Sequence, residues 1–276
     1  MVAWYFLRPD QSGEYALSQL NQLRTNLRNV PSGFAQEAVL AASRYMTWHE
    51  TAESFLASLY RDADVPRRLQ TDRYWHIRVI SPTTERPYPL IEREVEEQQR
   101  YLEGLEKQLL HYQELLRPDP DEALFICDTN VLVHGLPFEQ VRWNEEFTEK
   151  KARLLLPLVV IDELDALKDR GIREAGGVLK ALDGVLAPGK ALDRVTLRDN
   201  VTLQIVDEPV GHQRLVRIDD EIVQQAAFYT SMAGRKITLF TRDRGMRVRA
   251  ETSVADLEGR MLPTKYERRH DFDTKA

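Results

Sequence analysis

The sequence predicts an α/β fold with a doubly wound parallel sheet and helices on both faces, preceded by an all-helical N-terminal domain. Up to residue 118 the apolar residues recur at helical spacing, whereas beyond it short apolar runs alternate with amphipathic stretches. Between the two patterns stands "RPDPDE", residues 117–122, whose two prolines cannot continue a helix. We therefore expect a helical domain over residues 1–118, an α/β domain over residues 119–265 and a flexible tail over residues 266–276.

Three long helices are predicted in the N-terminal domain. The first places Ala16, Leu17, Leu20, Leu23 and Leu27 on one face, and the second begins near Gly33 and runs to about Tyr60. The third has an apolar seam with Gln98 as its polar member: Ile91, Val95, Leu102, Leu105, Leu109, Tyr112 and Leu116. This seam either packs on the neighbouring helices or forms the coil of a homodimer in which Gln98 fixes the register.

The second domain reads as strands separated by helices. The segments 123–127, 153–161 and 236–240 are too apolar for strands with one solvated face, as expected of parallel strands covered on both sides. Helices are predicted over residues 162–171, 173–187 and 219–234. Residues 195–208 predict an antiparallel hairpin with its turn near Asp199 and Asn200, inserted on the sheet.

Composition narrows the classes of function. The longest apolar run, Leu154 to Ile161, is too short to span a bilayer, and the first residues lack the features of a signal peptide. We therefore expect a cytoplasmic protein without a membrane partner. The net charge of −6 argues against a general nucleic-acid coat, unless several acids are neutralised in one metal site. Cys127, the single cysteine, is expected in the core.

Acidic residues follow the predicted strands. Asp128 comes directly after the first strand, Glu163 follows the second with one residue between, and Asp243 follows the third after two residues. Asp219 and Asp220 open the helix before the third strand. The carboxyl ends of parallel strands share one edge of the sheet, so these acids are expected to converge there. Each one alone could equally be a helix N-cap.

Converging carboxylates require a positive charge between them. Two carboxylates about 4 Å apart repel by roughly 1 kcal/mol in water and about 4 kcal/mol at an effective dielectric of 20. A set of oxygen ligands suits a hard cation, Mg²⁺ or Mn²⁺, rather than zinc. Such an ion can polarise a phosphoryl oxygen and activate water, which predicts hydrolysis of a phosphodiester.

Four segments resemble, in order, the motifs of the PIN-domain nucleases: "ICDTNVLVH" (126–134), "VVIDELDALKDR" (159–170), "DDEIVQQA" (219–226) and "LFTRDRGMRVRA" (239–250). The "REAGG" segment (173–177) is similar to the one found in larger PIN proteins, related to the nonsense-mediated-decay endonuclease and to PhoH-fused PIN domains. The resemblance covers roughly residues 123–263. It does not extend to the first 118 residues, which are expected to serve dimerisation or target recognition.

The resemblance implies a PIN-like fold and a metal-dependent endoribonuclease that cleaves single-stranded RNA with Mg²⁺ or Mn²⁺. It implies that the catalytic, metal-binding residues are Asp128, Glu163, Asp219 and Asp243, with Asp220 in reserve. Asn130 and Thr241 would hold these carboxylates in place. The residues expected to meet the RNA backbone, or otherwise to be solvated, are Arg242, Arg244, Arg247, Lys168 and Arg173.

Two alternative functions remain open. The first is the toxin of a toxin–antitoxin pair, which would have an antitoxin-like protein partner, although such toxins are usually bare PIN domains without a long N-terminal extension. The second is a catalytically silent PIN-fold protein that binds RNA or acts as a scaffold. A metal-binding measurement separates the silent protein from the nuclease.

Overall fold

The computed structural model describes residues 5–8, 10–30, 38–186, 192–208 and 212–268. The chain divides into two compact units, Val2–Leu115 and Leu116–Ala276, and the division falls close to the predicted domain boundary. Most of the predicted tail, together with the predicted start of the second helix near Gly33, lies outside the described residues.

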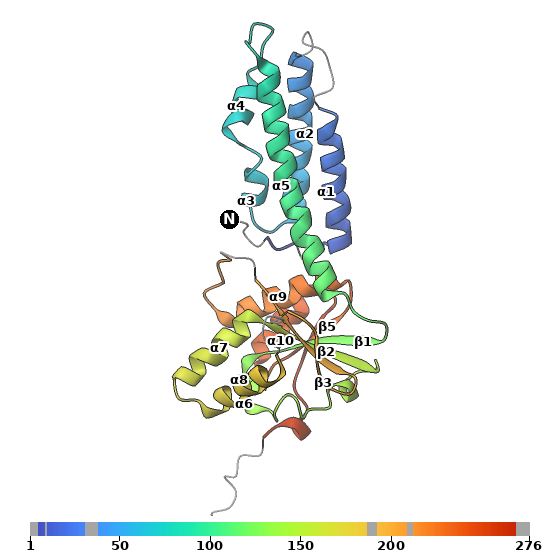
Figure 1. Cartoon of the computed structure of the whole chain (residues 1–276), viewed down its shortest axis with the longest axis vertical. Helices are drawn as coiled ribbons and strands as arrows, with labels where there is room; N and C mark the ends of the chain where they lie inside the picture. Colours follow the sequence, from blue (N-terminus) through green and yellow to red (C-terminus); the bar gives the residue numbers. More distant parts are fainter. Residues whose placement is uncertain (1–4, 9, 31–37, 187–191, 209–211, 269–276) are drawn as a thin grey trace, which may run out of the picture. The chain divides into compact units, whose positions relative to one another are not determined.

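The N-terminal unit is helical, and its elements can be followed in Figure 1. They are α1 (Gly13–Arg28), α2 (Ala38–Leu59), α3 (Asp64–Arg67), α4 (Asp72–Arg78) and α5 (Pro87–Leu116). Ser12 caps α1 because its hydroxyl accepts a hydrogen bond from the Tyr15 N–H. The predicted apolar face of α1 is buried, except that Leu17 is only partly covered. The helix therefore forms where the apolar spacing predicts it.

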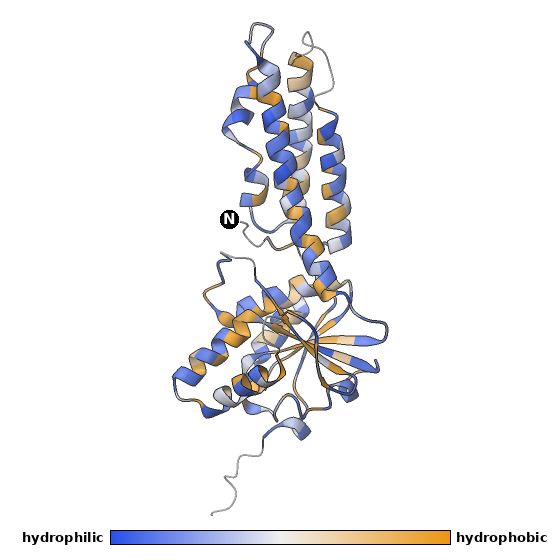
Figure 2. Ribbon diagram, in the orientation of Figure 1, coloured by the Kyte–Doolittle hydropathy of each residue, from blue (hydrophilic) through white to orange (hydrophobic). Residues whose placement is uncertain are grey.

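The seam of α5 is used for packing inside this unit. Its apolar side chains from Ile91 to Tyr112 are at most 7% exposed, and the solvent-facing residues of α5 are largely hydrophilic (Figure 2). Gln98 is also buried, and its amide donates to the Leu69 carbonyl (3.2 Å) and to Glu94 Oε1 (2.8 Å). The polar position thus fixes how α5 packs within its own chain. A homodimer remains a prediction, and it requires a surface other than this seam.

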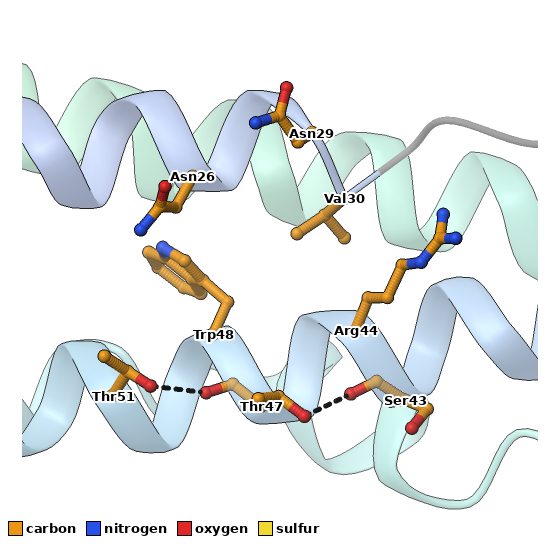
Figure 3. A pocket seen from close by; sticks show the side chains of 8 residues that line it. All are labelled: Asn26, Asn29, Val30, Ser43, Arg44, Thr47, Trp48 and Thr51. Carbon is orange, nitrogen blue, oxygen red and sulfur yellow. Dashed lines mark hydrogen bonds between the residues drawn. The ribbon is translucent and has the colours of Figure 1, made fainter.

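A pocket of about 540 Å³ lies between α1 and α2 (Figure 3). Trp48 forms part of its wall, with an indole N–H that donates to the Leu23 carbonyl (3.0 Å). The hydroxyls of Thr47 and Thr51 each donate to a carbonyl one turn earlier in α2. Amide, hydroxyl and guanidinium groups line this pocket, so its chemistry differs from that of the carboxylates in the second unit.

The C-terminal unit contains a six-stranded sheet in the order β3-β4-β2-β1-β5-β6, flanked by helices (Figure 1). Its strands are β1 (Glu122–Cys127), β2 (Lys151–Pro157), β3 (Val195–Arg198), β4 (Val201–Val206), β5 (Ile237–Phe240) and β6 (Leu257–Arg260). All neighbours pair in parallel except β3 and β4. The helices are α6 (Thr129–His134), α7 (Leu158–Asp169), α8 (Arg173–Val185), α9 (Ile218–Ala233) and α10 (Arg244–Ser253). The α/β fold class is therefore confirmed.

The strand order places a topological switch point between β1 and β5. From β1 the chain proceeds to β2 and β4 on one side, and it then returns through α9 to β5 and β6 on the other side. In open parallel sheets, ligands bind beyond the carboxyl ends of the strands at such a point. Asp128 directly follows β1, and Thr241 directly follows β5. These two residues therefore mark the site.

Two predictions about the strands were wrong. The predicted strand over residues 153–161 ends at Pro157, and residues from Leu158 onward form α7, because a largely buried helix start is as apolar as a buried strand. Glu163 consequently lies further inside its helix than the predicted start at residue 162 implied. The hairpin with positive φ at Asn200 is confirmed, but β4 also pairs in parallel with β2. This strand is thus a member of the main sheet and not an insertion.

The first residues of the predicted tail, from Tyr266 to Arg268, contact the rest of the C-terminal unit. Residues Thr264–Tyr266 form a short 3₁₀ helix, and Tyr266 is buried. Arg268 Nε donates to the Gly135 carbonyl (2.7 Å).

Among the described residues, no helix combines the length and the apolar character required to cross a membrane.

Candidate active site

Asp128 is fixed at the end of β1 by three hydrogen bonds. Its N–H donates to the Phe240 carbonyl (3.0 Å), continuing the pairing of β1 with β5. Its Oδ1 accepts from the Val131 N–H (2.7 Å) and so caps α6. Its Oδ2 accepts from the hydroxyl of Thr241 (2.5 Å). The carboxylate is therefore rigidly held, and the residue is only 2% exposed.

Asp243 repeats the same arrangement on the neighbouring strand. Its Oδ1 accepts from the Met246 N–H (2.8 Å) and caps α10, while its own N–H donates to Thr241 Oγ1 (3.0 Å). The buried hydroxyl of Thr241 therefore connects Asp128 to the backbone of Asp243. The hydrogen bond from Met246 lowers the pKa of Asp243, and the charges of Arg249 and Arg217 act in the same direction. Asp243 is exposed and carries a negative charge at neutral pH.

The environment of Asp128 has the opposite effect on its acidity. Burial raises the pKa of Asp128 to about 6, and the negative charges of Asp219 and Glu163 also raise it. The hydrogen bonds from Thr241 and Val131 limit this rise. Asp128 is therefore a buried carboxylate whose ionisation is disfavoured by the charges of two other predicted acids, Asp219 and Glu163. A bound cation would remove that opposition.

Glu163 approaches the site from α7. Its Oε2 accepts a hydrogen bond from the buried hydroxyl of Thr129, the residue that follows Asp128. Asn130 was predicted to hold the acids, but it is exposed and makes no side-chain hydrogen bond to another described residue. Thr129 and Thr241 are therefore the side chains that hold predicted acids. The first motif includes Thr129, yet its spacing alone does not distinguish it from Asn130.

Asp219 and Asp220 lie in the first turn of α9, where they face a cation from α10. Arg249 Nε is 3.0 Å from Asp220 Oδ1, and its Nη2 is 3.8 Å from Asp219 Oδ2. Arg217 Nε lies 3.8 Å from Asp220 Oδ2. Asp219 is thus the acid of this pair whose charge raises the pKa of Asp128, whereas Asp220 has two arginine partners.

The basic residues expected to contact the RNA backbone differ in whether they already have a partner within the protein. Arg247 donates to the Thr241 carbonyl (3.0 Å), Arg242 lies 3.5 Å from Glu267, and Lys168 lies 3.4 Å from Asp165 on its own helix. Arg173 and Arg244 are exposed in the first turns of α8 and α10, and neither makes an ion pair with another described residue. These two remain the most available for a substrate phosphate.

The donor chemistry fits a hard divalent ion, although the acids are not assembled around a single point. The four side chains offer only carboxylate oxygens, as Mg²⁺ and Mn²⁺ prefer. Within the described ranges, no group of three or more His, Cys, Asp or Glu side chains is arranged to hold a metal ion. Asp219 is paired with Arg249, and Glu163 accepts from Thr129, so these two side chains would have to adjust on metal binding.

A comparison with protein families identifies the kind of domain that the C-terminal unit resembles. Residues 125–257 match the family model described as the PIN domain, a range that includes all four predicted acids. A comparison with curated proteins gave no match. Together with the sheet topology and the switch point, the family match supports placing the chain among PIN-domain proteins.

Proposed function

We propose that the protein is a divalent-metal-dependent endoribonuclease that hydrolyses phosphodiester bonds in single-stranded RNA. The observation that carries the proposal is the hydroxyl of Thr241, which connects the buried carboxylate of Asp128 to Asp243 at the switch point. Asp219 and Glu163 approach closely enough to raise the pKa of Asp128. PIN domains are generally nucleases, and the family match covers all of these residues.

In this proposal Asp128, Glu163, Asp219 and Asp243 hold Mg²⁺ or Mn²⁺. The ion, when bound, supplies a Lewis acid for a phosphoryl oxygen and an activated water. The chain's own contribution is to place the carboxylates. Thr241 and the Val131 N–H hold Asp128, and Met246 holds Asp243. Burial of Asp128 excludes water from one side of the site, which strengthens its attraction for a cation.

RNA as the substrate class is supported by the resemblance of the four motifs and by exposed arginines at the starts of two helices of the same unit. Arg244 begins α10 directly after Asp243, and Arg173 begins α8. Their exposed guanidinium groups can form charge-assisted hydrogen bonds with phosphate oxygens. The net charge of −6 does not oppose this role, because a bound ion neutralises part of the acidic cluster.

Finer assignments extend the same proposal. The "REAGG" segment forms the start of α8 and supports placement near the PhoH-fused and nonsense-mediated-decay PIN proteins. The N-terminal helical unit would serve target choice or dimerisation, in a protein that works in the cytoplasm. If the protein instead acts as a toxin, its expression alone should arrest growth and an antitoxin-like partner should relieve the arrest.

A cleavage assay with matched RNA and DNA oligonucleotides tests the proposal. Cleavage of single-stranded RNA is expected with Mg²⁺ or Mn²⁺ and not with EDTA. Asp128→Asn and Asp243→Asn should each abolish it, whereas Asp165→Asn, which changes an exposed carboxylate on α7, should not. Cleavage that persists in EDTA or in both site variants would reject the proposal. RNA binding without divalent-ion binding by calorimetry would favour the silent scaffold.

A further inference from the structure

We propose that Arg249 is the internal counter-ion of the candidate active site, with which a divalent ion must compete for the carboxylates. In the metal-free protein its single positive charge offsets part of the negative charge of Asp219 and Asp220 at the start of α9. The inference rests on the proposed function, because it concerns the same metal site. It assigns to Arg249 the role of setting how tightly the site binds a divalent ion.

The position of the guanidinium supports this role. Arg249 extends from α10 toward α9, where it contacts both Asp219 and Asp220 at 3.8 and 3.0 Å. A Cβ placed on Gly245 would lie 3.0 Å from Asp243 Oδ1 and 3.2 Å from Arg249 Nη1. The guanidinium therefore lies over the first turn of α10, between the carboxylate of Asp243 and those of α9. A single cation thus neighbours two of the four predicted metal ligands.

Charge attraction holds the guanidinium there, without a full set of directional hydrogen bonds. Arg249 Nε and Nη2 are both buried, yet neither makes a hydrogen bond of good geometry with the described residues. Asp220 Oδ1 is buried and unsatisfied in the same way. A two-pronged arginine–carboxylate pair would satisfy these atoms. Because it does not form here, the contact can be exchanged for a cation of higher charge.

Other arginines in this region are less suited to the role. Arg247 is fixed by its hydrogen bond to the Thr241 carbonyl, and its backbone packs against Gly259. Arg217 is largely exposed and lies 3.8 Å from Asp220. Arg249 is 35% exposed, so its charge is less screened by solvent than that of Arg217.

Competition between Arg249 and a divalent ion predicts the direction in which the metal affinity of a variant changes. Removing the positive charge of Arg249 leaves Asp219 without its arginine partner and Asp220 with Arg217 alone, so a divalent ion should bind these carboxylates more tightly. Partly exposed ion pairs are modest in strength, which predicts a decrease in the dissociation constant of roughly 2- to 5-fold. A role confined to joining α9 with α10 predicts a lower melting temperature instead, with no gain in metal affinity.

Calorimetric titration of the full chain with Mn²⁺, at low salt and without RNA, distinguishes these cases. Arg249→Gln should bind Mn²⁺ more tightly than the wild type. Arg249→Lys keeps the charge but not the planar fork, so it should show a smaller change in the same direction. Arg170→Gln removes an exposed arginine at the end of α7 and should bind as the wild type does. Thermal melting of each variant verifies folding.

The outcomes separate the inference from the proposed function. If the wild type binds Mn²⁺ and neither Arg249 variant binds it more tightly, the counter-ion role is overturned while the nuclease proposal stands. If the Arg249 variants gain affinity but no variant or wild-type protein cleaves RNA, the counter-ion role is supported and the nuclease proposal fails. If no form binds Mn²⁺, both are overturned.

Discussion

Replacing Asp128 by Asn should stabilise the metal-free protein at neutral pH while it abolishes RNA cleavage. Asparagine has nearly the same shape, and its carbonyl can accept the Val131 N–H that Asp128 Oδ1 accepts now. Its NH₂ group can donate to the Thr241 oxygen, whose own proton can turn toward the Met246 sulfur 3.5 Å away. The substitution therefore removes a buried charge without leaving a buried polar group unsatisfied.

The magnitude follows from the pKa of Asp128. Its folded value of about 6 exceeds the reference value of 3.8, so the native state binds protons more tightly than the unfolded state between these limits. Stability should consequently fall as the pH rises from about 4 through about 6. Above that window the full effect is on the order of 3 kcal/mol, which corresponds to roughly 5–10 °C in melting temperature for a domain of this size.

Calorimetric melting in EDTA at pH 4 and at pH 7.5 measures this effect. The Asn variant should match the wild type at pH 4, where Asp128 is protonated, and exceed it at pH 7.5. Asp165→Asn is the control, because it neutralises an exposed carboxylate and should show no such difference between the two pH values. Added Mg²⁺ should stabilise the wild type more than the Asn variant and so narrow the gap.

One result would refute this reasoning. If the Asn variant is no more stable than the wild type at pH 7.5, or if the difference between them is the same at both pH values, the ionised carboxylate of Asp128 is not held at an energetic disadvantage. The proposed attraction of the site for a cation would then lose its physical basis.

Three further substitutions test contacts within the C-terminal unit. Thr241→Val removes the hydroxyl that joins the two capping aspartates. We therefore expect the free energy of unfolding in denaturant to fall by about 1–3 kcal/mol and cleavage to be lost. Thr241→Ser keeps the hydroxyl and should keep both stability and cleavage. Glu122→Gln leaves the fully buried guanidinium of Arg153 without its carboxylate, which should lower the free energy of unfolding by about 3–5 kcal/mol. A double variant with Arg153→Met should recover most of this stability. No recovery would contradict the assignment of Glu122 as the partner of a buried charge. Gly259→Ala places a Cβ 2.6 Å from the backbone of α10 and should lower the melting temperature, whereas Gly177→Ala, with open space around it, should be neutral or stabilising by up to about 1 kcal/mol. Equal melting temperatures for the two glycine variants would contradict this account of the close packing.

Local patterns in the sequence predict the parts of the site that depend on neighbouring residues. Asp128 and Asp243 each stand between a buried strand and a helix, and each accepts the N–H three residues later. This arrangement needs only the residue type and the adjacent chain, so it can be read from the motifs. The turn at Asn200 is local in the same sense, because its positive φ suits asparagine.

Within longer apolar runs, the boundary between a strand and a helix could not be predicted with the same precision. The sequence from Leu154 to Ile161 is apolar throughout, although β2 ends at Pro157 and α7 begins at Leu158. Both halves are buried on several sides, so neither shows the period that would separate strand from helix. The seam of α5 was ambiguous for a related reason, because an apolar stripe does not specify whether its partner belongs to the same chain.

The sequence by itself determined that Asp128 and Asp243 lie between a buried strand and the helix that each caps, because this arrangement depends on contacts along the chain. Only the tertiary structure decided which side chains from different helices meet. The packing of α9 against α10 brings Arg249 to Asp219 and Asp220, and the folding of α7 against α6 brings Glu163 to Thr129. These pairs join residues about 30 positions apart on separate helices. No local rule of spacing governs such pairs, since they arise from the way the helices pack around the sheet.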